Sequence, residues 1–310
     1  MERIEAFDIL KGIGIILMIV AHTYGPNDMI WDYIYAFHMP LFFIVTGYFY
    51  KQRPIAQLLK RNYSQLLLPY IAICIIVSIL TQIRESHEIL IDIDKTLNGM
   101  GPGWFLLAMF LARFELHFIL RVFPNSYLSI SLLISIIICF IATKLFFTSF
   151  ISFFPSLAGL FFISAGYYIK QNHLLDFYNR NHLRIPFICL LLWIITSLYG
   201  KVELSQCVFK LSFIDFAGSL GGTIFFFWIS QIIEKNTIHL KHILSATGRY
   251  SLIILFFHCI DYCVPIWYLV SPHIPPYLLL PIILVLRLLF VSICVMITLR
   301  IKILRLFFGI

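Results

Sequence analysis

The segment that decides the fold class runs from Tyr277 to Arg300 and reads YLLLPIILVLRLLFVSICVMITLR. A helix needs about 20 mostly apolar residues to cross a bilayer, and this segment meets that need with one charged side chain, Arg287, in its interior. Its apolar residues form a continuous run and do not alternate with polar ones, as they would in a membrane β-barrel. The segment therefore predicts a transmembrane helix.

Similar apolar segments recur along the whole chain of 310 residues. Ten can be placed, at about 9–25, 31–50, 66–83, 102–121, 127–146, 149–169, 185–200, 212–233, 250–270 and 277–300. The loops between them are short, and no linker or internal repeat divides the chain. The sequence predicts one all-α polytopic membrane domain over residues 1–310, a bundle of about ten transmembrane helices.

The composition excludes several other classes of protein. Hydrophobic residues make up 61% of the chain and charged residues 12%, whereas an ordinary soluble domain is about 45–50% apolar and about 25% charged. A cytosolic enzyme of this length could not bury so much apolar surface, and a disordered or secreted disulfide-rich chain would not contain it. The cysteines form no CxxC motif and most lie in apolar segments, so we expect neither disulfides nor a metal site.

The distribution of charge predicts the topology. The net charge of +8 comes from Lys and Arg residues in the loops of one side, most densely in KQRPIAQLLKR (51–61). Such loops face the cytoplasm and its anionic lipids, so we expect membrane lipid, and not nucleic acid, as their partner. With an even number of spans, both termini are predicted inside and the loop RESHEILIDIDK (84–95) outside. The membrane is predicted to be the cytoplasmic (inner) membrane of a bacterium.

Ionisable residues at membrane depth are the main functional candidates. Asp8, Lys11 and His22 lie near one face of the first helix, because residues three, seven or eleven positions apart share a helix face. His38 is expected at a depth close to that of His22, beside a kink at Pro40. Two imidazoles at one depth suit proton transfer, but buried structural histidines and interfacial anchors would give the same pattern.

Further polar residues lie in later segments. Arg113 and Glu115 belong to the fourth, His258 and Asp261 to the ninth, and Arg287 to the tenth. Charges within a bilayer are normally paired. Two arginines and two acids therefore predict two buried ion pairs that hold helices together, and His258 shares a helix face with Asp261.

The beginning of the chain, from Arg3 through Asp8 and Lys11 to His22, resembles that of the acyltransferase-3 family, membrane enzymes that move acyl groups onto sugars. In that family an arginine precedes the first-helix histidine at the spacing that separates Lys11 from His22. Because lysine lacks a guanidinium fork, it would contact a phosphate as a point charge only. The resemblance extends over most of the chain, through FHMPLFFIVTGYF (37–49), GPGWFLLAMF (101–110) and TGRYSLIILFFHC (247–259).

The resemblance implies a membrane O-acyltransferase, in the simplest case an O-acetyltransferase, that uses cytoplasmic acetyl-CoA or another acyl-CoA. The acceptor would be a hydroxyl of a cell-surface or exported polysaccharide, or of a glycolipid or lipid-linked sugar. The donor arm would follow the Asp8–His22 face, with His22 as general base or acyl carrier and His38 sharing the proton or orienting the substrate. The donor phosphates would meet Lys11, Arg53, Lys60 and Arg61.

Three other functions remain open from the sequence. A transporter or flippase for a lipid-linked sugar would also use intramembrane charges and helices broken by proline. An unrelated membrane acyltransferase with an Asn/His site is a second alternative, and a purely structural membrane subunit is a third. The residues name neither the acceptor sugar nor the acyl group.

Overall fold

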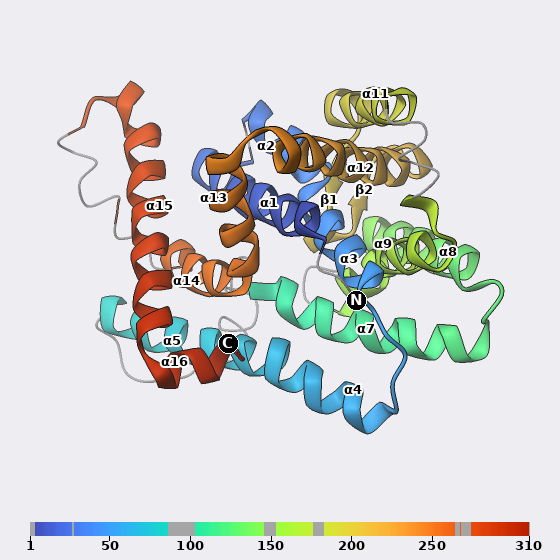
Figure 1. Cartoon of the computed structure of the whole chain (residues 1–310), viewed down its shortest axis with the longest axis horizontal. Coiled ribbons are helices and arrows are strands. Elements are labelled where there is room, and N and C mark those ends of the chain that lie inside the picture. The colour runs from blue at the N-terminus through green and yellow to red at the C-terminus, as the bar shows by residue number, and fades with distance from the viewer. Residues whose placement is uncertain are drawn as a thin grey trace.

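The computed structural model describes residues 4–26, 28–85, 103–145, 153–175, 183–263, 267 and 274–309. These parts of the chain are almost entirely helical (Figure 1). The first half contains α1 (Glu5–Tyr24), α2 (Met29–Tyr35), α3 (His38–Tyr48), α4 (Ile55–Asn62), the π-helical η1 (Tyr63–Leu67), α5 (Leu68–Glu85), α7 (Trp104–Val122) and α8 (Tyr127–Leu145). The second half contains α9 (Phe153–Gln171), α11 (Arg184–Tyr199), α12 (Phe213–Asn236), α13 (Ile238–Arg249), α14 (Ser251–Cys263), α15 (Pro276–Arg300) and α16 (Lys302–Phe308).

One small hairpin interrupts the helices. Strands β1 (Val202–Glu203) and β2 (Val208–Phe209) are antiparallel, with Val202 opposite Phe209, and the short 3₁₀ helix η3 (Leu204–Gln206) joins them. Strand β1 packs against α2, which follows the end of α1. The hairpin was not predicted, and it lies beside the helices that carry the candidate site.

The all-α membrane prediction is confirmed, since several helices are long and apolar enough to cross a bilayer. Within the described residues there are five such helices, and up to six when the pair α13 and α14, bent by 69°, is taken as one span. The five are Glu5–Tyr24, Met29–Tyr48, Ile55–Thr81, Phe213–Asn236 and Tyr277–Arg300. Ten spans with both termini inside therefore stay a prediction. The expected outer loop 84–95 lies outside the described residues except for its first two positions.

The second predicted segment is two helices and not one. Helix α2 ends at Tyr35 and α3 begins at His38, so the break precedes Pro40. Pro40 stands in the first turn of α3, where a backbone N–H has no partner within the helix. The chain therefore breaks without losing a hydrogen bond at the proline, and the break places Tyr35 and His38 beside each other, with ring centroids 4.6 Å apart.

Helix α1 is the central helix of the fold. It contacts α2, α3, α12, α13, α14 and α15, and Figure 1 shows it toward the middle of the molecule with α15 along one edge. Its approach to α13 is close because glycines face each other: a Cβ on Gly12 would lie 2.2 Å from the carbonyl oxygen of Leu244, and one on Gly248 would lie 1.7 Å from that of Asp8. This packing fixes the N-terminal half of α1, which carries Asp8 and Lys11.

Candidate active site

His22, near the C-terminal end of α1, is bonded through both ring nitrogens. Its Nδ1 lies 2.8 Å from Nε2 of His258 on α14, and its Nε2 lies 2.8 Å from the hydroxyl oxygen of Tyr35 on α2. The two imidazole rings stack with centroids 5.1 Å apart. A neutral imidazole donates at one nitrogen and accepts at the other, so Tyr35, His22 and His258 form a continuous hydrogen-bonded chain. Both histidines were predictable as ionisable residues at membrane depth, but their contact with each other was not.

Arg287 on α15 holds the end of α1. Its Nη1 donates to the carbonyl oxygen of His22 at 3.0 Å and to Oγ1 of Thr23 at 3.2 Å. Its Nε lies 3.1 Å from Oδ2 of Asp261 on α14, with the two side chains only 2% and 1% exposed. Asp261 also accepts a hydrogen bond from the indole of Trp267. The predicted intramembrane pair of Arg287 and Asp261 therefore exists, and it ties the helices of His22 and His258 together.

Aromatic rings border His22. Trp31 stacks on Tyr35 with ring centroids 3.6 Å apart, and the ring of Tyr262 lies 5.0 Å from that of His22. Trp31 is buried, whereas Tyr262 is 37% exposed. One aromatic ring beside His22 is therefore accessible to a ligand.

The β1–β2 hairpin places a carboxylate, Glu203, next to α2, the helix that carries Tyr35. Ser205 donates to Oε1 of Glu203 at 3.4 Å, and Glu203 also interacts electrostatically with Lys201 and Asp32. Burial raises the pKa of Glu203 above its ordinary value, and Lys201 and Ser205 oppose that rise. Because Lys201, Glu203 and Ser205 all lie in or next to a hairpin outside the predicted apolar segments, sequence reasoning gave no signal for them.

The side chain of Tyr35 lies between His38 and His22. It is fully buried, and its Nδ1 donates to the carbonyl oxygen of Ile34 at 3.0 Å. Its Nε2 has no hydrogen-bond partner in the described part of the chain. The structure places His38 edge-on to Tyr35. It therefore touches the hydrogen-bonded chain through Tyr35 and forms no hydrogen bond to His22.

Asp8 and Lys11 lie at the other end of α1. The side chains form an ion pair, with Lys11 Nζ 2.8 Å from Asp8 Oδ1. At 1.5 Å per residue, Asp8 is roughly 21 Å from His22 along the helix axis. The structure therefore does not bring Asp8 together with the two histidines, and any role it has must act at the Lys11 end.

Lys11 opens onto a cationic pocket of about 250 Å³. Five cationic residues line it and none of its lining residues is a carboxylate; the cations are Lys11, Lys51, Arg53, Arg61 and Arg113. Lys60, which was grouped with them from the sequence, does not line it. Clustering of like charges without acids is unfavourable unless an anion joins them, so this pocket suits a multiply charged anion.

A tyrosine adds a neutral hydroxyl to the same pocket. Tyr50 lines it and bonds to Nδ1 of His117 at 3.2 Å. Burial, with a smaller contribution from Tyr167, raises the pKa of Tyr50 to about 12, against the opposing effect of Arg113 and Arg121. Tyr50 therefore stays protonated near neutral pH and adds no negative charge.

The prediction of two buried ion pairs is wrong for the second pair, because Arg113 and Glu115 do not pair with each other. Arg113 donates from Nη1 to Oδ1 of Asn62 at 3.0 Å, while Glu115 accepts a hydrogen bond of 2.5 Å from Ser156 on α9. Residues two positions apart on a helix point to different sides and do not meet. Arg113 therefore faces the cationic pocket, whereas Glu115 faces α9.

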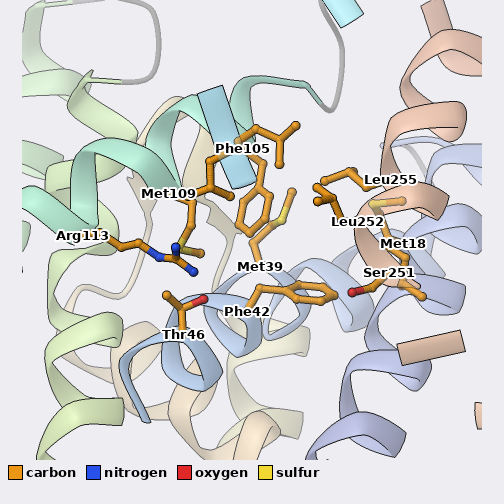
Figure 2. A pocket seen from close by; sticks show the side chains of 13 residues that line it. Met18, Met39, Phe42, Thr46, Phe105, Met109, Arg113, Ser251, Leu252 and Leu255 are labelled. Carbon is orange, nitrogen blue, oxygen red and sulfur yellow. The ribbon is translucent and has the colours of Figure 1, made fainter. Parts of the chain in front are cut away.

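A second cavity, of about 110 Å³, adjoins the cationic pocket (Figure 2). It shares Thr46 and Arg113 with the cationic pocket, and apolar side chains form most of its wall. Met18 lines it from α1, one turn before His22, and Leu255 lines it from α14, nearly one turn before His258. The cavity thus leads from the cationic pocket toward the histidine pair, between α1, α3, α7 and α14.

No metal cluster accompanies the site. In the described ranges, no group of three or more His, Cys, Asp or Glu side chains could hold a metal ion. The chemistry that the arrangement offers is proton transfer at the histidine chain and anion binding at the cationic pocket.

Comparison with known proteins identifies the family. The profile of the acyltransferase domain of the acyltransferase-3 family matches residues 4–301. Over 130 residues the chain is 28% identical to "Nodulation protein NolL" of Mesorhizobium japonicum, a match that covers 36% of this chain and 34% of that protein. The chain thus spans about a third of the length of this relative, and no solved structure matches it. Since the family match covers nearly all of its residues, the chain belongs to the acyltransferase-3 family.

Proposed function

We propose that the protein is a membrane O-acyltransferase that takes an acyl group, in the simplest case acetyl, from cytoplasmic acyl-CoA. It transfers the group to a hydroxyl of a cell-surface or exported polysaccharide, a glycolipid or a lipid-linked sugar. The observation that carries the proposal is the order of three features: a cationic pocket, an adjoining apolar cavity, and a histidine pair about one helical turn beyond the cavity lining. A donor with phosphates at one end and a reactive thioester at the other fits that order.

At the donor end, the phosphates of acyl-CoA would lie among the cations of the pocket. Arg53, Arg61 and Arg113 offer planar guanidinium groups that can bind phosphate oxygens in pairs. Lys11 adds a point charge, and Asp8, 2.8 Å from Lys11, orients it. Lys60 lies outside the pocket lining and in this proposal meets the membrane headgroups at its rim.

At the reactive end, His22 would act as general base. That role needs the tautomer in which Nδ1 of His22 donates to Nε2 of His258, so that Nε2 of His22 can accept a proton. The acceptor hydroxyl oxygen forms a bond to the thioester carbonyl carbon while its proton moves to His22 Nε2. The carbon–sulfur bond then breaks, and the proton passes to the leaving thiolate of CoA. Such base assistance is worth about 10²–10⁴-fold in rate.

Tyr35 and its neighbours would receive the acceptor. The hydroxyl of Tyr35 already occupies the position next to His22 Nε2 that an acceptor hydroxyl must reach. The exposed ring of Tyr262 offers a face on which a sugar ring can stack. His38 supports Tyr35 from the side and, in this proposal, orients it for proton transfer.

The proposed topology has ten spans with both termini in the cytoplasm of a bacterium and the protein in its inner membrane. This supports the donor assignment, because the cationic pocket then opens where acyl-CoA is made. Reporter fusions at residues 57 and 176 should be cytoplasmic and one at residue 90 external; positions 90 and 176 lie outside the described residues. An external reporter at residue 57 would invert the arrangement and remove the donor pocket from its substrate.

The proposed activity is tested with purified protein, labelled acetyl-CoA and a panel of cell-surface glycans. Appearance of label on a glycan hydroxyl is the expected result. Movement of a lipid-linked glycan across vesicles without acylation would favour the transporter instead. No observation on the described residues favours that alternative, and membership of an acyltransferase family argues for the enzyme.

A further inference from the structure

We infer that the apolar cavity between α1, α3, α7 and α14 binds the pantetheine arm of acyl-CoA and that the hydroxyls of Thr46 and Ser251 are its hydrogen-bonding groups. This inference rests on the proposed function and assigns roles to two residues that the proposed function leaves without one. It also changes the expected path of the donor. The arm would not follow the Asp8 face of α1, because Asp8 packs toward α13. It would instead run through the cavity on the side of Lys11 and Met18.

The position of the cavity matches what the arm must bridge. Lys11 and His22 are roughly 16 Å apart along α1 at 1.5 Å per residue. Ile15 and Met18, which lie between them in the chain, both line the cavity. The cavity shares Arg113 and Thr46 with the cationic pocket, so the two spaces adjoin, as the arm and the phosphates of one donor require.

The chemistry of the cavity also matches. A pantetheine arm is mainly methylene and methyl groups with two amides and one hydroxyl, so it needs apolar walls with a small number of hydrogen-bonding groups. The lining is mainly methionine, phenylalanine and leucine, and its polar members are Thr46, Ser251 and Arg113. Figure 2 shows Arg113 and Thr46 on one side of the cavity and Ser251 across it, with Phe42 between them. Methionines adapt their shape to a flexible chain more readily than branched residues do.

The two hydroxyls are free to bond a ligand. Several helical hydroxyls in the described residues donate to the carbonyl one turn earlier, as Thr23, Ser197 and Ser230 do at 2.8 Å. Within the described ranges, neither Thr46 nor Ser251 forms such a bond, and both lie on the cavity wall. Thr46, next to the cationic pocket, would bond the amide nearer the phosphates. Ser251, two turns before His258 on α14, would bond the amide nearer the thioester.

The test compares three probes that share parts of the donor. Binding of labelled acetyl-CoA to the purified full chain is measured in competition with unlabelled acetyl-CoA, pantetheine, or adenosine 3′,5′-bisphosphate. Thr46→Val and Ser251→Ala should each weaken acetyl-CoA and pantetheine by roughly two- to tenfold, as expected for one lost hydrogen bond, and leave the bisphosphate unchanged. Arg53→Gln should weaken acetyl-CoA and the bisphosphate and leave pantetheine unchanged, because pantetheine carries no phosphate. Thr237→Val and Ser292→Ala, at exposed positions, are the matched controls.

The outcomes separate this inference from the proposed function. Unchanged acetyl-CoA affinity in both hydroxyl variants, or an equal loss for the bisphosphate, would overturn the arm site while leaving the enzyme intact. If the unaltered protein bound neither acetyl-CoA nor the bisphosphate, the proposed function would be overturned, and the arm site with it. Each conservative variant tests its own hydroxyl, so if one fails to fold, unchanged acetyl-CoA affinity in the other overturns the arm site.

Discussion

Nδ1 of His22 lies 2.8 Å from Nε2 of His258, although the two residues are separated by 236 positions in the chain. Helices α1 and α14 meet at this point because Arg287 bonds to the end of one and pairs with Asp261 on the other. The contact joins two histidines from distant segments in one hydrogen-bonded pair. A third helix, α2, completes it through Tyr35.

Replacing His22 should abolish acyl transfer. We expect His22→Ala and His22→Gln to lower the rate by about 10²–10⁴-fold, because neither side chain can accept the acceptor's proton. His258→Gln should lower the rate less, because His258 fixes the tautomer of His22 and does not itself take the proton. Acyl transfer is measured at matched protein amounts, with His239→Ala, an exposed histidine on α13, as the control. Retention of more than a few per cent of the activity in His22→Ala would remove His22 as the base.

Breaking the Arg287–Asp261 pair should lower both stability and activity, and replacing both residues should restore stability but not activity. Removing one partner of a buried ion pair costs about 3–5 kcal/mol because the other charge stays buried, so Arg287→Leu and Asp261→Leu should each lower the thermal unfolding temperature. The double variant should recover much of that stability. It should not recover activity, because the His22 carbonyl has lost its donor. Recovery of full activity in the double variant would show that the clamp does not position His22.

The close packing of α1 on α13 should be intolerant of a single methyl group. A Cβ on Gly12 would come within 2.2 Å of a backbone oxygen, which cannot move aside as a side chain can. Overpacking of this kind typically costs about 1–3 kcal/mol, so Gly12→Ala should lower the unfolding temperature. Gly14→Ala is the control on the same helix, because its Cβ would lie 3.3 Å from the flexible side chain of Leu41. Equal unfolding temperatures for the two variants would contradict the close approach.

The helices were largely predictable because bilayer thickness imposes long apolar runs. The sequence missed α13, whose apolar residues are interrupted by Lys241 and His242, and it missed the hairpin, which is too short to give a pattern. It placed the break of the second segment at Pro40, whereas proline is tolerated in a first turn and the chain breaks before it.

The site was predictable in its members but not in its contacts. His22, His258, Asp261 and Arg287 stand out because ionisable groups are rare at membrane depth. Which of them meet depends on how distant helices pack, and sequence spacing carries no information on that. Charge balance alone predicted two ion pairs, and it failed for Arg113 and Glu115 because residues two apart do not share a helix face. Tyr35 had a usable signal, since it lies one helical turn before His38.

Lys11 should affect binding of the donor and not of the acceptor. Its ammonium group lines the cationic pocket and is held by Asp8, at the opposite end of α1 from His22. We therefore expect Lys11→Ala to raise the KM for acyl-CoA several-fold while the KM for the glycan stays constant. Lys11→Arg should retain activity and lower the KM for acyl-CoA, because a guanidinium fork can bind two phosphate oxygens where an ammonium binds as a point charge. Steady-state kinetics with each substrate varied in turn measures both constants. Asp8→Asn, which frees the ammonium without removing it, should raise the donor KM less than Lys11→Ala does. If Lys11→Ala raised both KM values equally, Lys11 would be a structural anchor of α1 and the pocket would have to hold the donor through its arginines alone.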